Sequence, residues 1–171
     1  MESPESSIQI SLPTAADGER LLGLARGIQL FTAEDVETIR ELWTEFVTKG
    51  DEKSWYHFFV ARQGEEIVGF GCYGRRALTE ATWDYYWMGV AQHLQGKGIG
   101  KQLMEYVKAA VKARGGKLLL IETAGKPQFE PTRQFYFRYP GVNASKADAR
   151  QALKLCRSVR KEARLSLGLP V

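Results

Sequence analysis

The sequence predicts one α/β domain in which a mixed, mostly antiparallel sheet is flanked by helices. Two observations carry this prediction. Residues 82–90 are aromatic and β-branched, as in a strand, and they lead through a glycine-rich turn at residues 95–100 into a helical pattern. Further strand and helix patterns surround this unit. The length of 171 residues suits one compact domain with a core and is short for two.

The elements before this unit begin with a strand and two helices. Residues 7–12 alternate between polar and apolar side chains, as a half-buried strand does, and residues 14–26 favour a helix. A clearer helix begins at Thr32, which has Asp35 three residues later as in a capping box, and ends at Gly50.

Two strand patterns then predict an antiparallel hairpin. They cover residues 55–62 and 66–73 and are joined by a short turn that contains Gly64. The helix after the glycine-rich turn is expected to reach about Arg114, and the nearly continuous apolar run at residues 117–123 predicts a buried strand. With a helix after this strand, the expected order is β-α-α-β-β-β-α-β-α.

The glycine-rich turn has the composition of an anion-binding site. Gly96, Gly98 and Gly100 lack a Cβ, so their backbone N–H groups can turn toward one point, and the next helix adds unpaired donors and its positive dipole end. The spacing differs from a P-loop, because no Gly-Lys-Ser/Thr follows at the required distance. Alternate glycines also differ from the dinucleotide fingerprint.

The turn reads Gln-x-x-Gly-x-Gly from Gln95, and this pattern resembles the acetyl-CoA pyrophosphate loop of the GNAT superfamily of N-acetyltransferases. Residues 132–138, which contain Phe135 and Tyr136, are similar to the Phe-Tyr helix that follows the fifth strand in that superfamily. Residues 69–74 are similar to the third strand of many members. The resemblance covers about residues 7–138 and implies the GNAT fold.

The resemblance implies a transfer of an acetyl group from acetyl-CoA, the expected cosubstrate, to a primary amine by direct attack in a ternary complex. The acceptor is expected to be a small molecule or a peptide. Backbone N–H groups of the loop would hold the pyrophosphate, and Lys97 would either add a charge there or be simply solvated. These cosubstrate-binding candidates are Gln95, Gly96, Lys97, Gly98, Ile99 and Gly100. The backbone of residues 88–90 would pair with the pantetheine arm, with the N–H of Val90 polarising the carbonyl.

Catalysis of this kind also needs a base for the amine and an acid for the departing thiolate. Asp84 and Glu122 are the candidate bases, although Asp84 could instead bond a backbone turn and Glu122 could instead pair with a lysine. Tyr136 is the candidate acid, its alternative role being that of a core tyrosine.

Alternation along residues 82–90 predicts two faces of the strand. Trp83, Tyr85 and Trp87 are expected on one face, with Asp84 and Tyr86 on the other. Core packing is the expected role of the three aromatic rings, and binding of a substrate cation is the alternative. Gly89 is expected to ease a β-bulge.

The C-terminus departs from the family pattern. GNAT members usually continue with two further strands, whereas residues 144–171 follow a helical pattern with seven basic and two acidic side chains. We therefore expect an acetyltransferase domain at residues 1–143 and a basic helical extension at residues 144–171. Either this helix replaces the final hairpin, or the gene departs from its relatives there, for instance through a shift of reading frame.

Composition excludes several other classes. Residues 144–171 carry a net charge of +5 and the other residues a net charge of −1, so the overall charge of +4 says little about the ligand of the domain. Nucleic acid is disfavoured as a partner. The two cysteines and the isolated His57 and His93 predict no metal site. No apolar run approaches a membrane span, so a cytoplasmic protein without a membrane partner is expected, with a homodimer as one option. The alternative function is a CoA-binding module of GNAT type without catalysis, its C-terminal half being degenerate.

Overall fold

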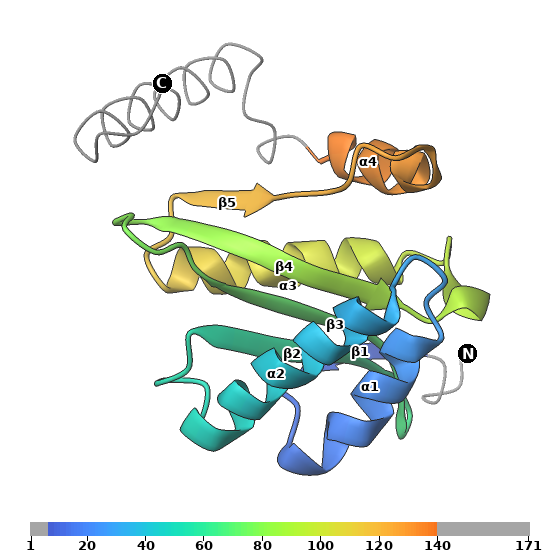
Figure 1. Ribbon diagram of the computed structural model, residues 1–171, viewed down its shortest axis with the longest axis horizontal. Coiled ribbons are helices and arrows are strands. Elements are labelled where there is room, and N and C mark those ends of the chain that lie inside the picture. The colour runs from blue at the N-terminus through green and yellow to red at the C-terminus, as the bar shows by residue number, and fades with distance from the viewer. Residues whose placement is uncertain (1–6, 140–171) are drawn as a thin grey trace, which may run out of the picture. The chain divides into compact units, whose positions relative to one another are not determined.

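The computed structural model describes residues 7–139, and its helices and strands follow the expected order (Figure 1). The strands are β1 (Ile8–Ser11), β2 (Tyr56–Gln63), β3 (Glu66–Arg75), β4 (Thr82–Val90) and β5 (Leu118–Ile121). The helices are α1 (Gly18–Arg26), α2 (Ala33–Lys49), α3 (Ile99–Ala113) and α4 (Glu130–Phe137). The predicted helix at residues 144–171, and with it the replacement of the last hairpin, lies outside the described residues.

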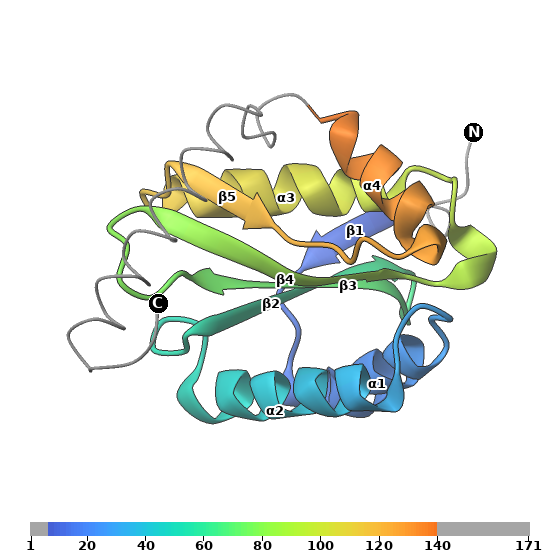
Figure 2. The ribbon, with the colours of Figure 1, turned by 45° about the horizontal axis from the view of Figure 1, so that its top comes forward.

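The strands form one five-stranded sheet in the order β1-β2-β3-β4-β5. Neighbours from β1 to β4 are antiparallel, and β4 and β5 are parallel. Helices α1 and α2 cover one face of this sheet, and α3 covers the other (Figure 2). The predicted mixed, mostly antiparallel sheet flanked by helices is therefore confirmed.

Helix α2 forms as its capping pattern predicts. Thr32 accepts a hydrogen bond from the Asp35 N–H at 3.1 Å, and the Asp35 carboxylate accepts one from the Thr32 N–H at 2.7 Å. The helix ends at Gly50, whose φ of +76° is readily accessible to glycine. Its buried face packs on the sheet through Val36, Ile39, Trp43 and Phe46.

Strand β4 contains a β-bulge at Tyr86. Trp87 pairs with Cys72, but the next residue of β3, Tyr73, pairs with Tyr85. Tyr86 is therefore an extra residue in β4, and an extra residue reverses the alternation of side chains beyond it.

The bulge overturns the prediction that three aromatic residues share one face. Trp83 and Tyr85 are buried on the face that α3 covers, where Tyr85 stacks on Phe59. Trp87 instead packs edge-on against Phe31, between α1 and α2, with ring centroids 5.3 Å apart. The aromatic rings of β4 are thus divided between the two faces of the sheet.

The predicted bulge at Gly89 is also wrong. Pairing between β3 and β4 is regular from Val90 back to Trp87. A glycine fits here for another reason, because a Cβ at Gly89 would lie 2.5 Å from the side chains of Ile28 and Phe70. Gly89 therefore permits close packing of β4 against the α1 side of the core.

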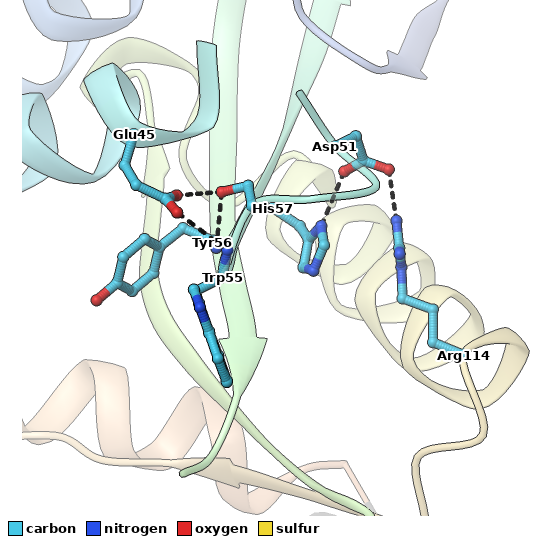
Figure 3. A network of polar contacts seen from close by, with 7 residues as sticks. Glu45, Asp51, Trp55, Tyr56, His57 and Arg114 are labelled. Carbon is cyan, nitrogen blue, oxygen red and sulfur yellow. Dashed lines mark hydrogen bonds and ion pairs between the residues drawn. The ribbon is translucent and has the colours of Figure 1, made fainter. Parts of the chain in front are cut away.

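A polar network ties the start of β2 to the end of α3 (Figure 3). The Asp51 carboxylate contacts the His57 ring at 2.9 Å and accepts a hydrogen bond from Arg114 at 2.5 Å. His57 is buried, and burial lowers its pKa, partly offset by the hydrogen bond to Asp51. His57 is therefore paired with Asp51, and among residues 7–139 no third His, Cys, Asp or Glu joins this pair as a metal site would require.

Figure 3 also shows Glu45, which binds the residues that lead into β2. Glu45 of α2 accepts hydrogen bonds from the Ser54 hydroxyl and from the Trp55 N–H, the latter at 3.2 Å. Ser54 is buried, so its hydroxyl needs such a partner. Helix α2 thereby holds the first residues of β2 by hydrogen bonds as well as by apolar packing.

The chain divides into two compact units after Glu130, so all of α4 beyond its first residue belongs to the second unit. Within this unit the Phe135 ring contacts the rings of Tyr136 at 5.3 Å and Tyr139 at 5.0 Å, measured between centroids. The predicted Phe-Tyr helix is confirmed. The division into domains at residues 143 and 144 stays a prediction.

We predict that His57 makes the stability of the protein fall in mild acid. Its pKa in the folded chain lies below the ordinary value of 6.5, so the unfolded chain binds this proton more readily. Its contribution is therefore complete above pH 6.5 and is lost as the pH falls toward the lower folded pKa, by at most about 1.4 kcal/mol per pH unit.

Urea unfolding between pH 7.5 and 5.5 checks this. The loss of stability should be smaller in His57→Gln, which cannot take up the proton. Equal losses in the two proteins would contradict the assignment.

Candidate active site

The glycine-rich turn follows β4 and a short 3₁₀ turn, η3 (Gln92–Leu94), and opens α3. Gly96 and Gly98 have φ values of +78° and +87°, in the left-handed region that glycine readily adopts. Gly98 is the N-cap of α3, and a Cβ added at either position would meet no atom within 4 Å. The turn therefore presents exposed backbone toward open space.

Helix α3 supplies directed donors at this turn. The first N–H groups of any helix lack a partner within the helix, and here they belong to residues such as Ile99 and Gly100. Ile99 and Leu103 are buried beneath the helix, which fixes its position on the sheet. An anion at the turn would meet both these N–H groups and the positive end of the helix dipole.

Gln95, the first residue of the predicted binding loop, makes two hydrogen bonds within the chain. Its backbone N–H donates to the Gln92 carbonyl at 3.3 Å, so this group already has a partner. Its side-chain amide donates to the Val90 carbonyl at 3.3 Å and so links the turn to the end of β4. We infer that Gln95 positions the turn.

Strand β4 has an open edge beside this turn. Strand β5 pairs with β4 from Thr82 to Tyr85, where Tyr85 lies opposite Ile121. Within residues 7–139, no strand pairs with residues 86–90 of β4 on the β5 side. The two strands thus separate before β4 reaches the turn.

The hydrogen-bond pattern decides which groups face this open edge. The Ala91 N–H donates to the Val68 carbonyl at 2.8 Å, which makes these two residues a hydrogen-bonded pair. Because such pairs alternate along an antiparallel ladder, the N–H groups of Val90 and Met88 point away from β3. The open edge therefore carries the Val90 N–H, the group predicted to polarise a carbonyl.

The two predicted bases lie together in a pocket where β4 and β5 separate. An arginine that the sequence analysis missed, Arg76, joins them: it contacts Asp84 at 2.7 Å and Glu122 at 3.5 Å. The pocket has a volume of about 340 Å³ and is lined by Arg76, Asp84, Tyr85, Tyr86, Leu120 and Glu122.

Arg76 distinguishes the two carboxylates. The Asp84 side chain is 16% exposed and accepts a short charge-assisted hydrogen bond from Arg76, so one of its carboxylate oxygens already has a strong partner. The Glu122 side chain is 83% exposed and lies farther from the arginine, so its carboxylate oxygens are held less closely by that partner. The hydrogen bond to Asp84 raises the pKa of Arg76, which therefore stays charged.

Tyr136, the predicted acid, belongs to the unit beyond Glu130. Desolvation raises its pKa above the ordinary value of 10.0, so its hydroxyl keeps its proton at neutral pH. A protonated phenol is the form that an acid requires. Its role stays a prediction from the Phe-Tyr motif.

Among residues 7–139, no three His, Cys, Asp or Glu side chains come together as a metal site requires. None of the helices in that same range combines the length and the apolar composition needed to cross a bilayer.

We predict that the open edge is measurable by hydrogen exchange. The amides of Met88 and Val90 should exchange faster than the Gly89 amide between them, because only Gly89 points toward β3. NMR-detected exchange of the free protein compares the three amides directly. Equal protection would contradict the open edge.

A family profile, a sequence relative and solved structures all relate this chain to acetyltransferases. A profile of the Acetyltransferase (GNAT) domain matches residues 54–139. The 5-NmdU N-acetyltransferase of Pseudomonas phage PaMx11 is 36% identical over 86 residues, which are 50% of this chain and 56% of the phage protein. The chain thus spans little more than half the length of this relative.

Solved structures share the fold. A GNAT-family protein from Desulfovibrio desulfuricans is 33% identical, with a TM-score of 0.73 over 77% of this chain and 83% of that one. The PaiA N-acetyltransferase of Thermoplasma acidophilum, solved with coenzyme A, is 19% identical with a TM-score of 0.63 over 77% and 87% of the two chains, a likeness of fold alone. With a family profile across half of its length and this 33% identity to a structural relative, the chain belongs to the GNAT family of acetyltransferases.

Proposed function

We propose that the protein is an N-acetyltransferase that moves an acetyl group from acetyl-CoA to a primary amine by direct attack in a ternary complex. One observation carries this proposal. The exposed turn with left-handed Gly96 and Gly98 opens α3 immediately beside the unpaired edge of β4. An anion site and backbone N–H groups that no β5 residue pairs with are thereby adjacent, and a phosphate-bearing extended ligand requires both.

These residues fit acetyl-CoA. The turn offers backbone N–H groups and open space for a pyrophosphate, and the edge of β4 at Met88 and Val90 offers hydrogen bonds to an extended arm with amide groups. When bound, acetyl-CoA supplies an acetyl group activated as a thioester. The Thermoplasma neighbour was solved with coenzyme A, which supports the assignment at the level of the fold.

We assign three roles to side chains and backbone around the amine. The Val90 N–H, aimed at the open edge, stabilises the carbonyl oxygen as it becomes negative. An alkylamine has a pKa of about 10.4 and is mostly protonated at neutral pH, so a base must remove a proton. Glu122 is the better candidate because Arg76 holds Asp84 more tightly. Tyr136 is the proposed acid for the leaving thiolate.

Release of free thiol from acetyl-CoA tests the proposed function. The intact chain is incubated with a panel of primary amines, including 5-NmdU, the compound in the phage relative's name. Amine-dependent thiol release together with acetylated amine in the mass spectrum is expected. Binding of CoA without thiol release for any amine would instead support a CoA-binding module without catalysis.

We predict that Glu122→Gln lowers kcat/KM at neutral pH and that a rise in pH partly restores it. The substitution removes the base but keeps the shape of the side chain, and at higher pH more of the amine is already neutral. General-base loss should cost about 100-fold. Glu105→Gln, on the exposed surface of α3, is the matched control. An unchanged pH profile would remove Glu122 from the reaction.

We also predict that Tyr136→Phe lowers kcat, by about 100-fold for a lost acid, with little effect on the affinity for CoA. Steady-state kinetics and CoA titration measure the two quantities separately. Tyr106→Phe, on α3, is the control for a lost tyrosine hydroxyl. Unchanged turnover in Tyr136→Phe would remove this residue from the mechanism.

A further inference from the structure

The pocket between β4 and β5 combines an aromatic ring with carboxylates. Tyr86 is 38% exposed and lines the pocket together with Asp84 and Glu122. All of these residues lie in the unit that ends at Glu130. The pocket therefore places a partly exposed aromatic side chain beside negatively charged groups.

The β-bulge sets this arrangement. Tyr86 is the extra residue of β4, and its ring packs edge-on against Tyr56 with centroids 5.6 Å apart. This contact holds the Tyr86 ring in place. Desolvation and the nearby Asp84 charge raise the pKa of Tyr86 to about 12, so its ring stays neutral and can lie against an apolar group.

The pocket contains two carboxylates and one guanidinium, so it has one more negative than positive side chain. Asp84 and Glu122 face a single guanidinium, that of Arg76. Arg76 is closer to Asp84, at 2.7 Å, than to Glu122, at 3.5 Å. Glu122 therefore has oxygen atoms available for a second cation, such as the ammonium group of an incoming amine.

We propose that the pocket selects an acceptor amine carried on a planar aromatic ring. The ring lies against Tyr86, and the ammonium group donates hydrogen bonds to Glu122. This inference rests on the proposed function, because it names the class of acceptor for that site.

The volume of the pocket suits such a ligand, and the known strength of aromatic ring pairs sets the expected preference. A volume of about 340 Å³ lies at the lower end of ligand pockets, which suits a small ring rather than a long chain. A ring pair adds about 0.5–1.5 kcal/mol beyond buried area, which corresponds to roughly 2–12-fold in affinity. A saturated ring of similar size has no such interaction, so the comparison isolates the aromatic contribution.

Binding to the ¹⁵N-labelled protein tests the proposal without any acetyl transfer. The probes are benzylamine, cyclohexylmethylamine and benzyl alcohol, which separate the aromatic ring from the charge. We expect benzylamine to bind about fivefold more tightly than cyclohexylmethylamine, with amide shifts at Asp84 and Tyr86, and benzyl alcohol to bind more weakly than benzylamine.

Variants locate the preference. Tyr86→Leu should reduce the ratio of the two amine affinities to about one, whereas Tyr86→Phe should keep it. Tyr106→Leu removes a ring on the other face of the sheet and should also keep it. Equal affinities in the unchanged protein, a ratio that survives Tyr86→Leu, or no binding of either amine would each overturn the proposal.

Failure of the aromatic preference and failure of acetyl transfer give different results. Thiol release with aliphatic amines as fast as with aromatic ones would leave an acetyltransferase without the predicted acceptor class. Selective binding of benzylamine without thiol release for any amine would contradict the acetyltransferase itself.

Discussion

The parallel pairing of β4 with β5 stops at Tyr85 and Ile121, and the candidate site depends on this early stop. Beyond Tyr85, backbone groups of β4 that would otherwise be hydrogen-bonded to β5 face an open edge, while β3 pairs regularly with the other edge from Trp87 to Val90. A backbone N–H directed at a bound carbonyl needs such a combination of support on one side and access on the other. The left-handed turn at Gly96 and Gly98 lies where this edge ends.

The β-bulge at Tyr86 adds side chains to this backbone arrangement. Without the extra residue, Trp87 would lie on the α3 face with Tyr85. With it, the aromatic rings divide, so that β4 anchors both layers of the core and presents Tyr86 at the pocket beside Asp84. The bulge at Tyr86 therefore affects both the packing of the core and the lining of the pocket.

Local patterns allowed much of the fold and the turn to be predicted from sequence. The capping pair Thr32 and Asp35 and the alternate glycines act through neighbouring residues, so their structures follow from short-range rules. The bulge depends on how β3 and β4 pair and leaves no signal in β4 alone. Contacts such as Arg114 with Asp51 join residues 63 positions apart, and only the tertiary structure brings them together. Arg76 was missed for the same reason.

Calorimetric titration of the protein with CoA tests whether the turn beside the open edge is the anion site. Gly98→Glu places a negative charge at the N-cap of α3, and Gly64→Glu, at another left-handed glycine with open space around it, is the matched control. We expect one CoA bound per chain, with binding lost in Gly98→Glu and retained in Gly64→Glu. Unchanged binding in a folded Gly98→Glu variant, or no binding by the intact chain, would contradict it.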